Sequence, residues 1–111
     1  MGISPNFNLM NSPLNPYHPG WALPVLRWHA FFLAGSGDEE EAWEWWRAAA
    51  TRGDTQSAWC LGLSLLNKKL SQRHVQEALF WLQAGSPPGK EKMQTYSIAT
   101  CRRILSAREI P

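Results

Sequence analysis

The sequence predicts an all-α fold: a short α-solenoid of about two helix-turn-helix repeats followed by a C-terminal capping helix. The first observation is a phrase that occurs twice, since residues 41–49 and 77–85 share Glu, Ala, Trp and Ala in register. Ala42 and Ala78 stand 36 positions apart, and such a period with helical patterning is typical of stacked helix pairs. The second observation is that apolar residues recur at helical spacing between Gly- and Pro-containing breaks. A repeat of this kind favours a binding scaffold over a catalytic pocket.

The first twenty residues differ from the rest of the chain. Residues 1–20 hold four prolines and four asparagines, and proline at this density interrupts both helices and sheets. We therefore predict an extended N-terminal arm over residues 1–20 and a helical-repeat domain over residues 21–111. Two interpretations of the arm stay open. It is either a leader without fixed packing, or a segment whose apolar residues pack along a groove of its own domain or of a second copy. Those apolar residues are Phe7, Leu9, Met10, Leu14 and Tyr17.

Two helices are predicted in the first half of the repeat domain. The first begins after Pro24, is apolar on nearly every side, and ends at the Gly-Ser-Gly of residues 35–37. Asp38 is the expected N-cap of the second helix, and the three glutamates at 39–41 suit the positive end of its dipole. Three consecutive carboxylates also invite a metal-site interpretation, but a helix start is favoured. The second helix, which ends at residues 52–53, carries an apolar stripe for burial: Ala42, Trp45, Trp46, Ala49 and Ala50.

Three further helices complete the prediction. The third spans about residues 56–67, with Asp54 or Thr55 as its cap, and a basic connector follows at residues 68–73. The fourth repeats the helical spacing of the second, and the Gly-Ser-Pro-Pro-Gly of residues 85–89 breaks it. A last helix is expected near residues 91–107. The apolar positions of the fourth helix are Val75, Ala78, Leu79 and Leu82.

Composition narrows the class of protein. An apolar share of 44% is ordinary for a globular domain, and a net charge of +2 is too small to indicate nucleic acid or membrane binding by itself. We see no apolar run of about 18 residues and no secretory signal, so we expect a cytoplasmic protein that does not span a membrane. Cys60 and Cys101 fit packing residues in a reducing compartment, and a disulfide would require their helices to be adjacent. Seven tryptophans suit both cores and interfaces.

Small and aromatic residues follow a fixed spacing through the centre of the chain. The first pass reads Ala42, Trp45, Trp46, Ala49, Ala50, Gly53, Ser57, Leu61 and Gly62, and the second reads Ala78, Trp81, Leu82 and Gly89. This pattern resembles the Sel-one-like repeat family, a branch of the tetratricopeptide superfamily with units of about 36 residues. The resemblance covers roughly residues 25–100. The family's Gly-x-Gly-Val connector is absent at residues 68–72, and Ser97-Ile98 stands in the last Leu-Gly slot.

The resemblance implies an adaptor whose inner surface binds a segment of a protein partner, with the first helix of each pair lining the concave side. Removing the packing positions leaves six expected inner-face residues: Arg27, Phe31, Trp59, Leu63, Thr95 and Arg102. Trp43 lies off the apolar stripe, so we expect it to be exposed as a contact on the outer face. With two repeats, the expected function is a small adaptor, inhibitor or chaperone-like regulator. Two or three exposed tryptophans would favour a homodimer.

We find no arrangement in the sequence that predicts an enzyme, a metal site or a cofactor. The three histidines, His18, His29 and His74, lie far apart, without zinc-ligand spacing. A small basic nucleic-acid-binding regulator is the alternative function, although we do not expect nucleic acid to be the partner. Its basis is the basic bias of the C-terminal half, where basic side chains alternate with aromatic ones. The residues concerned are Lys68, Lys69, Arg73, Lys90, Lys92, Arg102, Arg103 and Arg108.

Overall fold

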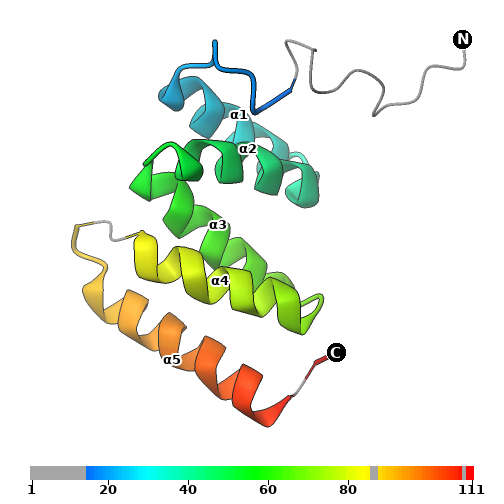
Figure 1. Cartoon of the computed structure of the whole chain (residues 1–111), viewed down its shortest axis with the longest axis vertical. Coiled ribbons are helices and arrows are strands. Elements are labelled where there is room, and N and C mark those ends of the chain that lie inside the picture. The colour runs from blue at the N-terminus through cyan, green and yellow to red at the C-terminus, as the bar shows by residue number, and fades with distance from the viewer. Residues whose placement is uncertain (1–14, 86–87, 109) are drawn as a thin grey trace, which may run out of the picture.

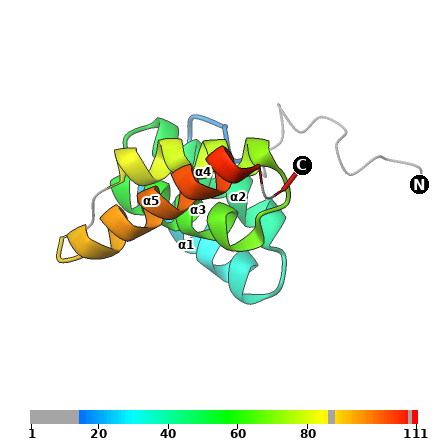
Figure 2. The same cartoon turned by 90° about the horizontal axis from the view of Figure 1, so that it is seen from below.

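The computed structural model describes residues 15–85, 88–108 and 110–111, and within these ranges the chain forms five α-helices and no strand (Figure 1). Consecutive helices pack against one another, so the helices form a stack along the long axis of the molecule (Figures 1 and 2). This confirms the predicted all-α fold class, and the last helix has the predicted bounds. The helices are α1 (Leu23–Gly35), α2 (Glu39–Thr51), α3 (Thr55–Lys68), α4 (Gln72–Ala84) and α5 (Glu91–Ala107).

Glycine-containing loops end α1 and α2 in the same way. Gly37 and Gly53 have φ angles of 93° and 101°, a region that glycine enters without steric cost. In each loop the next residue, Asp38 or Asp54, donates its backbone N–H to a carbonyl of the last helical turn. These are the hydrogen bonds of a Schellman ending, which satisfies carbonyls that the helix itself leaves unpaired. The short loops keep α1 next to α2 and α2 next to α3.

The two aspartates after these glycines act differently. Asp54 caps α3, because its Oδ2 accepts a hydrogen bond of 3.0 Å from the backbone N–H of Ser57. Asp38 occupies the N-cap position of α2, but its side chain makes no capping hydrogen bond within that fully described helix. Asp38 thus has the predicted N-cap position, but the prediction that its side chain caps the helix is wrong. The reason lies in the backbone, since ψ is 56° at Asp38 and 102° at Asp54, nearer the extended conformation that capping needs.

Part of the predicted arm packs on the helices. Asn15 and Pro16 are buried, and the Asn15 carbonyl accepts a hydrogen bond of 2.8 Å from the indole Nε1 of Trp21. The Trp21 ring meets Trp45 of α2 edge-on, with ring centroids 5.4 Å apart. In Figure 1 this stretch, drawn in blue, runs over the α1 end of the stack. Residues 1–14 of the predicted arm lie outside the described residues.

The core follows the stack from α1 to α5. Its largest fully buried aliphatic side chains are Leu26, Leu61, Leu65, Leu82 and Ile104. Small residues allow close helix contact, and a Cβ added at Gly62 would lie 2.7 Å from Cγ of Leu82. Within the described ranges, the longest helix, α5, and the four shorter ones all fall short of the length and apolarity that crossing a bilayer requires.

Candidate partner-binding surface

Two bidentate ion pairs join the first helix pair, α1–α2, to the second, α3–α4. Arg47 on α2 donates to both carboxylate oxygens of Glu77 on α4, at 2.6 and 2.9 Å. Arg27 on α1 donates to both oxygens of Asp54, the N-cap of α3, at 2.7 and 3.1 Å. Paired guanidinium–carboxylate hydrogen bonds fix orientation as well as distance. The Arg27–Asp54 pair links the first helices of the two units, and the Arg47–Glu77 pair links the second helices. Both helices of each unit therefore contribute to the junction.

These contacts set the charge state of the carboxylates. Burial raises the pKa of Asp54, but hydrogen bonds from Arg27 and Ser57 and the charge of Arg27 outweigh it, so the pKa is lowered. Burial likewise raises the pKa of Glu77, and hydrogen bonds from Arg47 and Trp81 reverse the shift to a lowered value. Both carboxylates are ionised at neutral pH. Arg27, an expected inner-face contact, is thus half-buried in an ion pair within the chain.

Trp43 is buried, which corrects the expectation that it is exposed on the outer face. Its side chain is 4% exposed, its Nε1 donates a hydrogen bond of 2.7 Å to Ser64 Oγ, and its ring packs beside His74. The reason is that α2 lies between α1 and α3, so helices cover two of its sides and its buried surface is wider than one stripe. Trp43 cannot contact a partner without unfolding this region.

Trp59 is also buried, at 6% exposure, which corrects its assignment to the open inner face. The end of α4 closes over it, since a Cβ added at Gly85 would lie only 2.6 Å from the backbone nitrogen of Trp59. Leu63, one turn later on α3, is half-buried against the core. Helix α3 therefore offers little open surface, because α2 and α4 pack on either side of it.

Three of the expected contact residues are exposed. Phe31 on α1 is 43% exposed, and its ring meets the buried ring of Trp46 edge-on at 5.6 Å. Thr95 and Arg102 are exposed on α5, where Thr95 Oγ1 donates to the Glu91 carbonyl of its own helix. Phe31 is thus an exposed aromatic ring that rests on a fixed one, which suits a contact residue because little side-chain freedom is lost on binding.

Helix α1 carries a second exposed group, the α1 end face, which we did not predict from the sequence. It consists of Val25, Trp28 and Phe32, and the two aromatic side chains are 65% and 67% exposed. Their spacing of three and four residues places them together, on the side of α1 opposite the buried Leu26 and Ala30. The feature of the sequence that could have predicted this exposed group is that residues 23–35 are apolar on nearly every side, because a surface helix normally keeps one polar side. On the helix at the other end, α5, the positions opposite the core are mostly polar.

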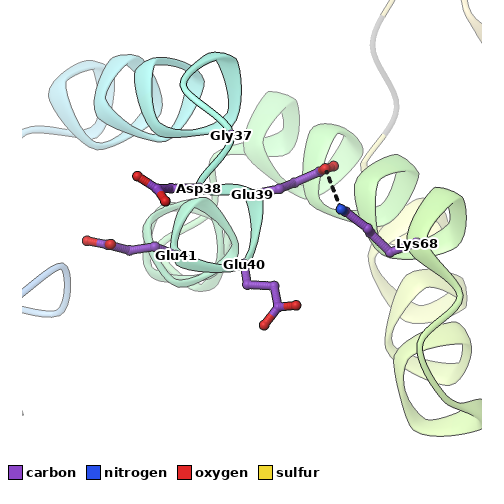
Figure 3. A pocket seen from close by; sticks show the side chains of 6 residues that line it. All are labelled: Gly37, Asp38, Glu39, Glu40, Glu41 and Lys68. Carbon is purple, nitrogen blue, oxygen red and sulfur yellow. Dashed lines mark ion pairs between the residues drawn. The ribbon is translucent and has the colours of Figure 1, made fainter.

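An acidic surface pocket lies at the start of α2, and its volume is about 260 Å³ (Figure 3). Residues 37–41 line it together with Lys68 of α3, whose Nζ lies 3.6 Å from Glu39 Oε1. The other oxygen of Glu39 accepts a hydrogen bond from Ser64, the residue that holds Trp43. In Figure 3 the Glu39 side chain points toward Lys68, Asp38 and Glu41 point to the opposite side, and Glu40 points away from both. No His, Cys, Asp or Glu cluster suited to a metal ion occurs in the described part of the chain, and the three glutamates form the first turn of α2.

The two thiols are free, and Cys101 is fully buried. Burial raises the pKa of Cys60 to about 11; the charge of Asp54 adds to this effect and that of Arg27 opposes it. A thiol with this pKa is almost wholly protonated at neutral pH and is a poor nucleophile. The His29 ring lies 4.2 Å from that of Trp45, between centroids, and His18 Nδ1 accepts a hydrogen bond from Gly20. These groups serve local packing.

Comparison of the chain with protein-family models, with curated proteins and with solved structures found no match to any of them.

Proposed function

We propose that this chain is a protein-interaction module without enzymatic activity. It acts as a small adaptor, inhibitor or chaperone-like regulator and binds one protein partner through the surface of Sel-one-like helix pairs. The stacked pairs support this proposal, because a stack joined by ion pairs presents a rigid surface rather than an enclosed catalytic cavity. The two free thiols fit a reducing compartment, so we place the module in the cytoplasm.

The observation that carries the proposal is the position of Phe31. A ring that is exposed, yet rests on a buried tryptophan, has the character of an interface hot spot, where aromatic anchors supply most of the binding free energy. The indole Nε1 of Trp46 is buried and has no hydrogen-bond partner among the described residues. Arg102 and Thr95, which are also exposed, lie on α5 at the other end of the stack, so they belong to the binding surface only for a partner that spans the stack.

Affinity capture from an extract of the native host, followed by mass spectrometry, tests this proposal. The wild-type chain is compared with Phe31→Ser and with a control, Leu70→Ser, in which an exposed leucine between α3 and α4 is replaced. For the captured partner, Phe31→Ser should weaken binding by about thirtyfold or more, as expected when an anchor is lost. Leu70→Ser should bind as the wild type does. Equal capture by all three proteins would show that Phe31 is not the contact, and failure to capture any protein would count against the function itself.

The nucleic-acid alternative requires a separate measurement. Lys90, Lys92, Arg102 and Arg108 are exposed along or beside α5, with the exposed ring of Tyr96 between them. If these residues bound phosphates, affinity for a labelled single-stranded oligonucleotide would fall steeply between 50 and 200 mM salt (roughly tenfold or more). We expect no binding at either salt concentration. Salt-sensitive binding that Arg102→Glu abolishes would favour the alternative over the protein partner.

A further inference from the structure

The α1 end face leaves a large apolar surface open at one end of the stack. From the exposed fractions of Val25, Trp28 and Phe32, its area is on the order of 300 Å². A patch of this size is among the largest on ordinary monomeric domains, and patches of this kind are often interaction sites. The end of a helix stack also needs a cover, because each unit normally buries the face of its neighbour. We therefore expect another molecule or segment to cover the α1 end face.

The chain itself leads to this face. Asn15 is fixed where the described part begins, because its Oδ1 accepts a hydrogen bond of 3.0 Å from the Tyr17 backbone and its carbonyl accepts one from Trp21. The Trp21 ring contacts the Trp45 ring, whose centroid lies 4.2 Å from that of His29. The His29 centroid lies 6.4 Å from that of Phe32. Asn15, to which residues 1–14 are joined, is thus connected through Trp21, Trp45 and His29 to Phe32 of the α1 end face.

The length and composition of residues 1–14 fit the face. Fourteen residues can reach roughly 45 Å when extended, whereas the 13 residues of α1 span only about 20 Å. Residues 1–14 contain no charged side chain, and they include the apolar Ile3, Phe7, Leu9, Met10 and Leu14. The three residues of the end face are likewise uncharged. Prolines reduce the conformational freedom that docking would cost, and tethering gives the segment an effective concentration near millimolar.

We propose that residues 1–14 of this chain dock on its own α1 end face and cover Trp28 and Phe32. The segment takes the place of a preceding helix and closes the stack. A second copy fits the face less well, because stable dimers bury about 800 Å² on each partner and two end faces meeting would bury less than half of that. Phe31 is not one of the residues of the α1 end face, so this inference does not depend on the partner proposed for Phe31.

Nuclear magnetic resonance of the full chain tests the docking. Backbone order parameters of residues 3–14 should approach about 0.85 in dilute solution, and methyl groups of Leu9 or Met10 should show nuclear Overhauser effects to the rings of Trp28 or Phe32. Phe32→Ser removes one of the two exposed rings of the face and should lower the order parameters below about 0.6. Phe80→Ser, on α4, should leave them unchanged. Because Phe32 and Phe80 are both mostly exposed, both variants should fold.

Three results would overturn the inference. The first is order parameters below about 0.6 for residues 3–14 in the wild type. The second is ordering that Phe32→Ser leaves intact, which would place the segment elsewhere. The third is ordering that appears only as the protein concentration rises, together with a doubled mass in sedimentation, which would identify a second copy as the occupant. A variant with both Phe7→Ser and Leu9→Ser checks the contact from the other side and should release the segment as Phe32→Ser does.

Discussion

Arg47 on α2 and Glu77 on α4 form a bidentate ion pair between residues 30 positions apart in the sequence, with Nε and Nη2 bound to Oε2 and Oε1. Glu77 also accepts a hydrogen bond of 3.0 Å from Trp81 Nε1, and Arg47 also binds Glu44 at 2.7 Å. Glu44 in turn accepts a hydrogen bond from the Tyr17 hydroxyl; burial, followed by the hydrogen bond and charge of Glu44, raises the pKa of that phenol to about 12. One network therefore ties the N-terminal segment to both helix pairs.

The ion pair should stabilise the junction measurably. We expect Arg47→Met and Glu77→Gln to be coupled by about 1–3 kcal/mol in a double-mutant cycle, because the pair is partly buried and makes two charged hydrogen bonds. Urea unfolding of the wild type, both single variants and the double variant measures this coupling free energy. Glu40→Gln, an exposed site in the first turn of α2, is the control and should lower the unfolding midpoint less than either single variant, because it removes only a favourable interaction with the helix dipole. Additive single-variant effects would show that the two side chains do not interact in solution.

Stability should fall in acid because of Asp54 and Glu77. Their folded pKa values are lowered, from ordinary values of 3.8 and 4.5, by hydrogen bonds and charge that outweigh the opposing effect of burial. A carboxylate whose pKa is lower in the folded than in the unfolded protein stabilises the fold at pH values above its ordinary pKa. This stabilisation is lost as the pH falls through the pKa of the folded state. The free energy of unfolding should therefore be nearly constant from pH 7 to 5.5 and then decrease below about pH 4. Denaturant titrations at each pH measure it.

The matched control for this pH dependence removes both titrating groups. The double variant Asp54→Asn, Glu77→Gln should be less stable than the wild type at pH 7 but should lose less further stability on acidification. If the double variant and the wild type lost the same amount between pH 5.5 and 3, other carboxylates would be responsible for the acid sensitivity.

The two adjacent buried tryptophans allow a hydrogen bond to be separated from packing. Trp43→Phe removes the hydrogen bond to Ser64, whereas Trp46→Phe removes an indole N–H that is unpaired among the described residues. Both changes remove a similar volume from sites with similar burial, so Trp43→Phe should cost about 1–2 kcal/mol more than Trp46→Phe. Thermal and urea unfolding give the difference. Equal costs would indicate that the hydrogen bond contributes nothing net.

Truncation of the same tryptophan tests its burial. Because Trp43 is enclosed, Trp43→Ala should cost about 3–5 kcal/mol, as we also expect for Trp45→Ala and Trp81→Ala. From the sequence alone, Trp43→Ala would be expected to cost much less than the other two. A cost below about 1 kcal/mol, measured by urea unfolding, would restore the exposed position that the helical stripe suggested.

Gly62 should not tolerate a methyl group. An added Cβ would lie 2.7 and 2.9 Å from two carbons of Leu82 and 3.2 Å from the Ala78 carbonyl oxygen, so α3 and α4 would have to separate. Gly62→Ala should therefore destabilise the domain by about 1–3 kcal/mol, even though alanine favours a helix by about 1 kcal/mol. The control is Gly35→Ala in α1, where an added Cβ meets nothing within 4 Å. That change should be neutral or slightly stabilising by thermal unfolding, and equal effects at the two sites would contradict the close approach.

The sequence by itself determined, to within about two residues, where the helices begin and end. Helical periodicity, the Gly-containing loops and the break at residues 85–89 are local features, and local hydrogen bonding decides them. This is why the predicted last helix, 91–107, agrees with the bounds of α5. The 36-residue repeat likewise predicted stacked helices, because each unit can bury its apolar side only against a neighbour. The exposure of Phe31 was also expected, from the resemblance to helix-pair repeats.

Only the tertiary structure decided which sides of those helices are covered. Periodicity within one helix marks a single buried stripe, but a helix inside a stack touches neighbours on two sides, which is why Trp43 and Trp59 are enclosed. The same periodicity did not reveal that Trp28 and Phe32 stay open, because exposure at the end of a stack depends on whether another helix packs against that end. The partner of Arg47 lies 30 positions away, beyond any local pattern. Burial and ion pairing depend on which surfaces meet in space, and that is a property of the assembled stack.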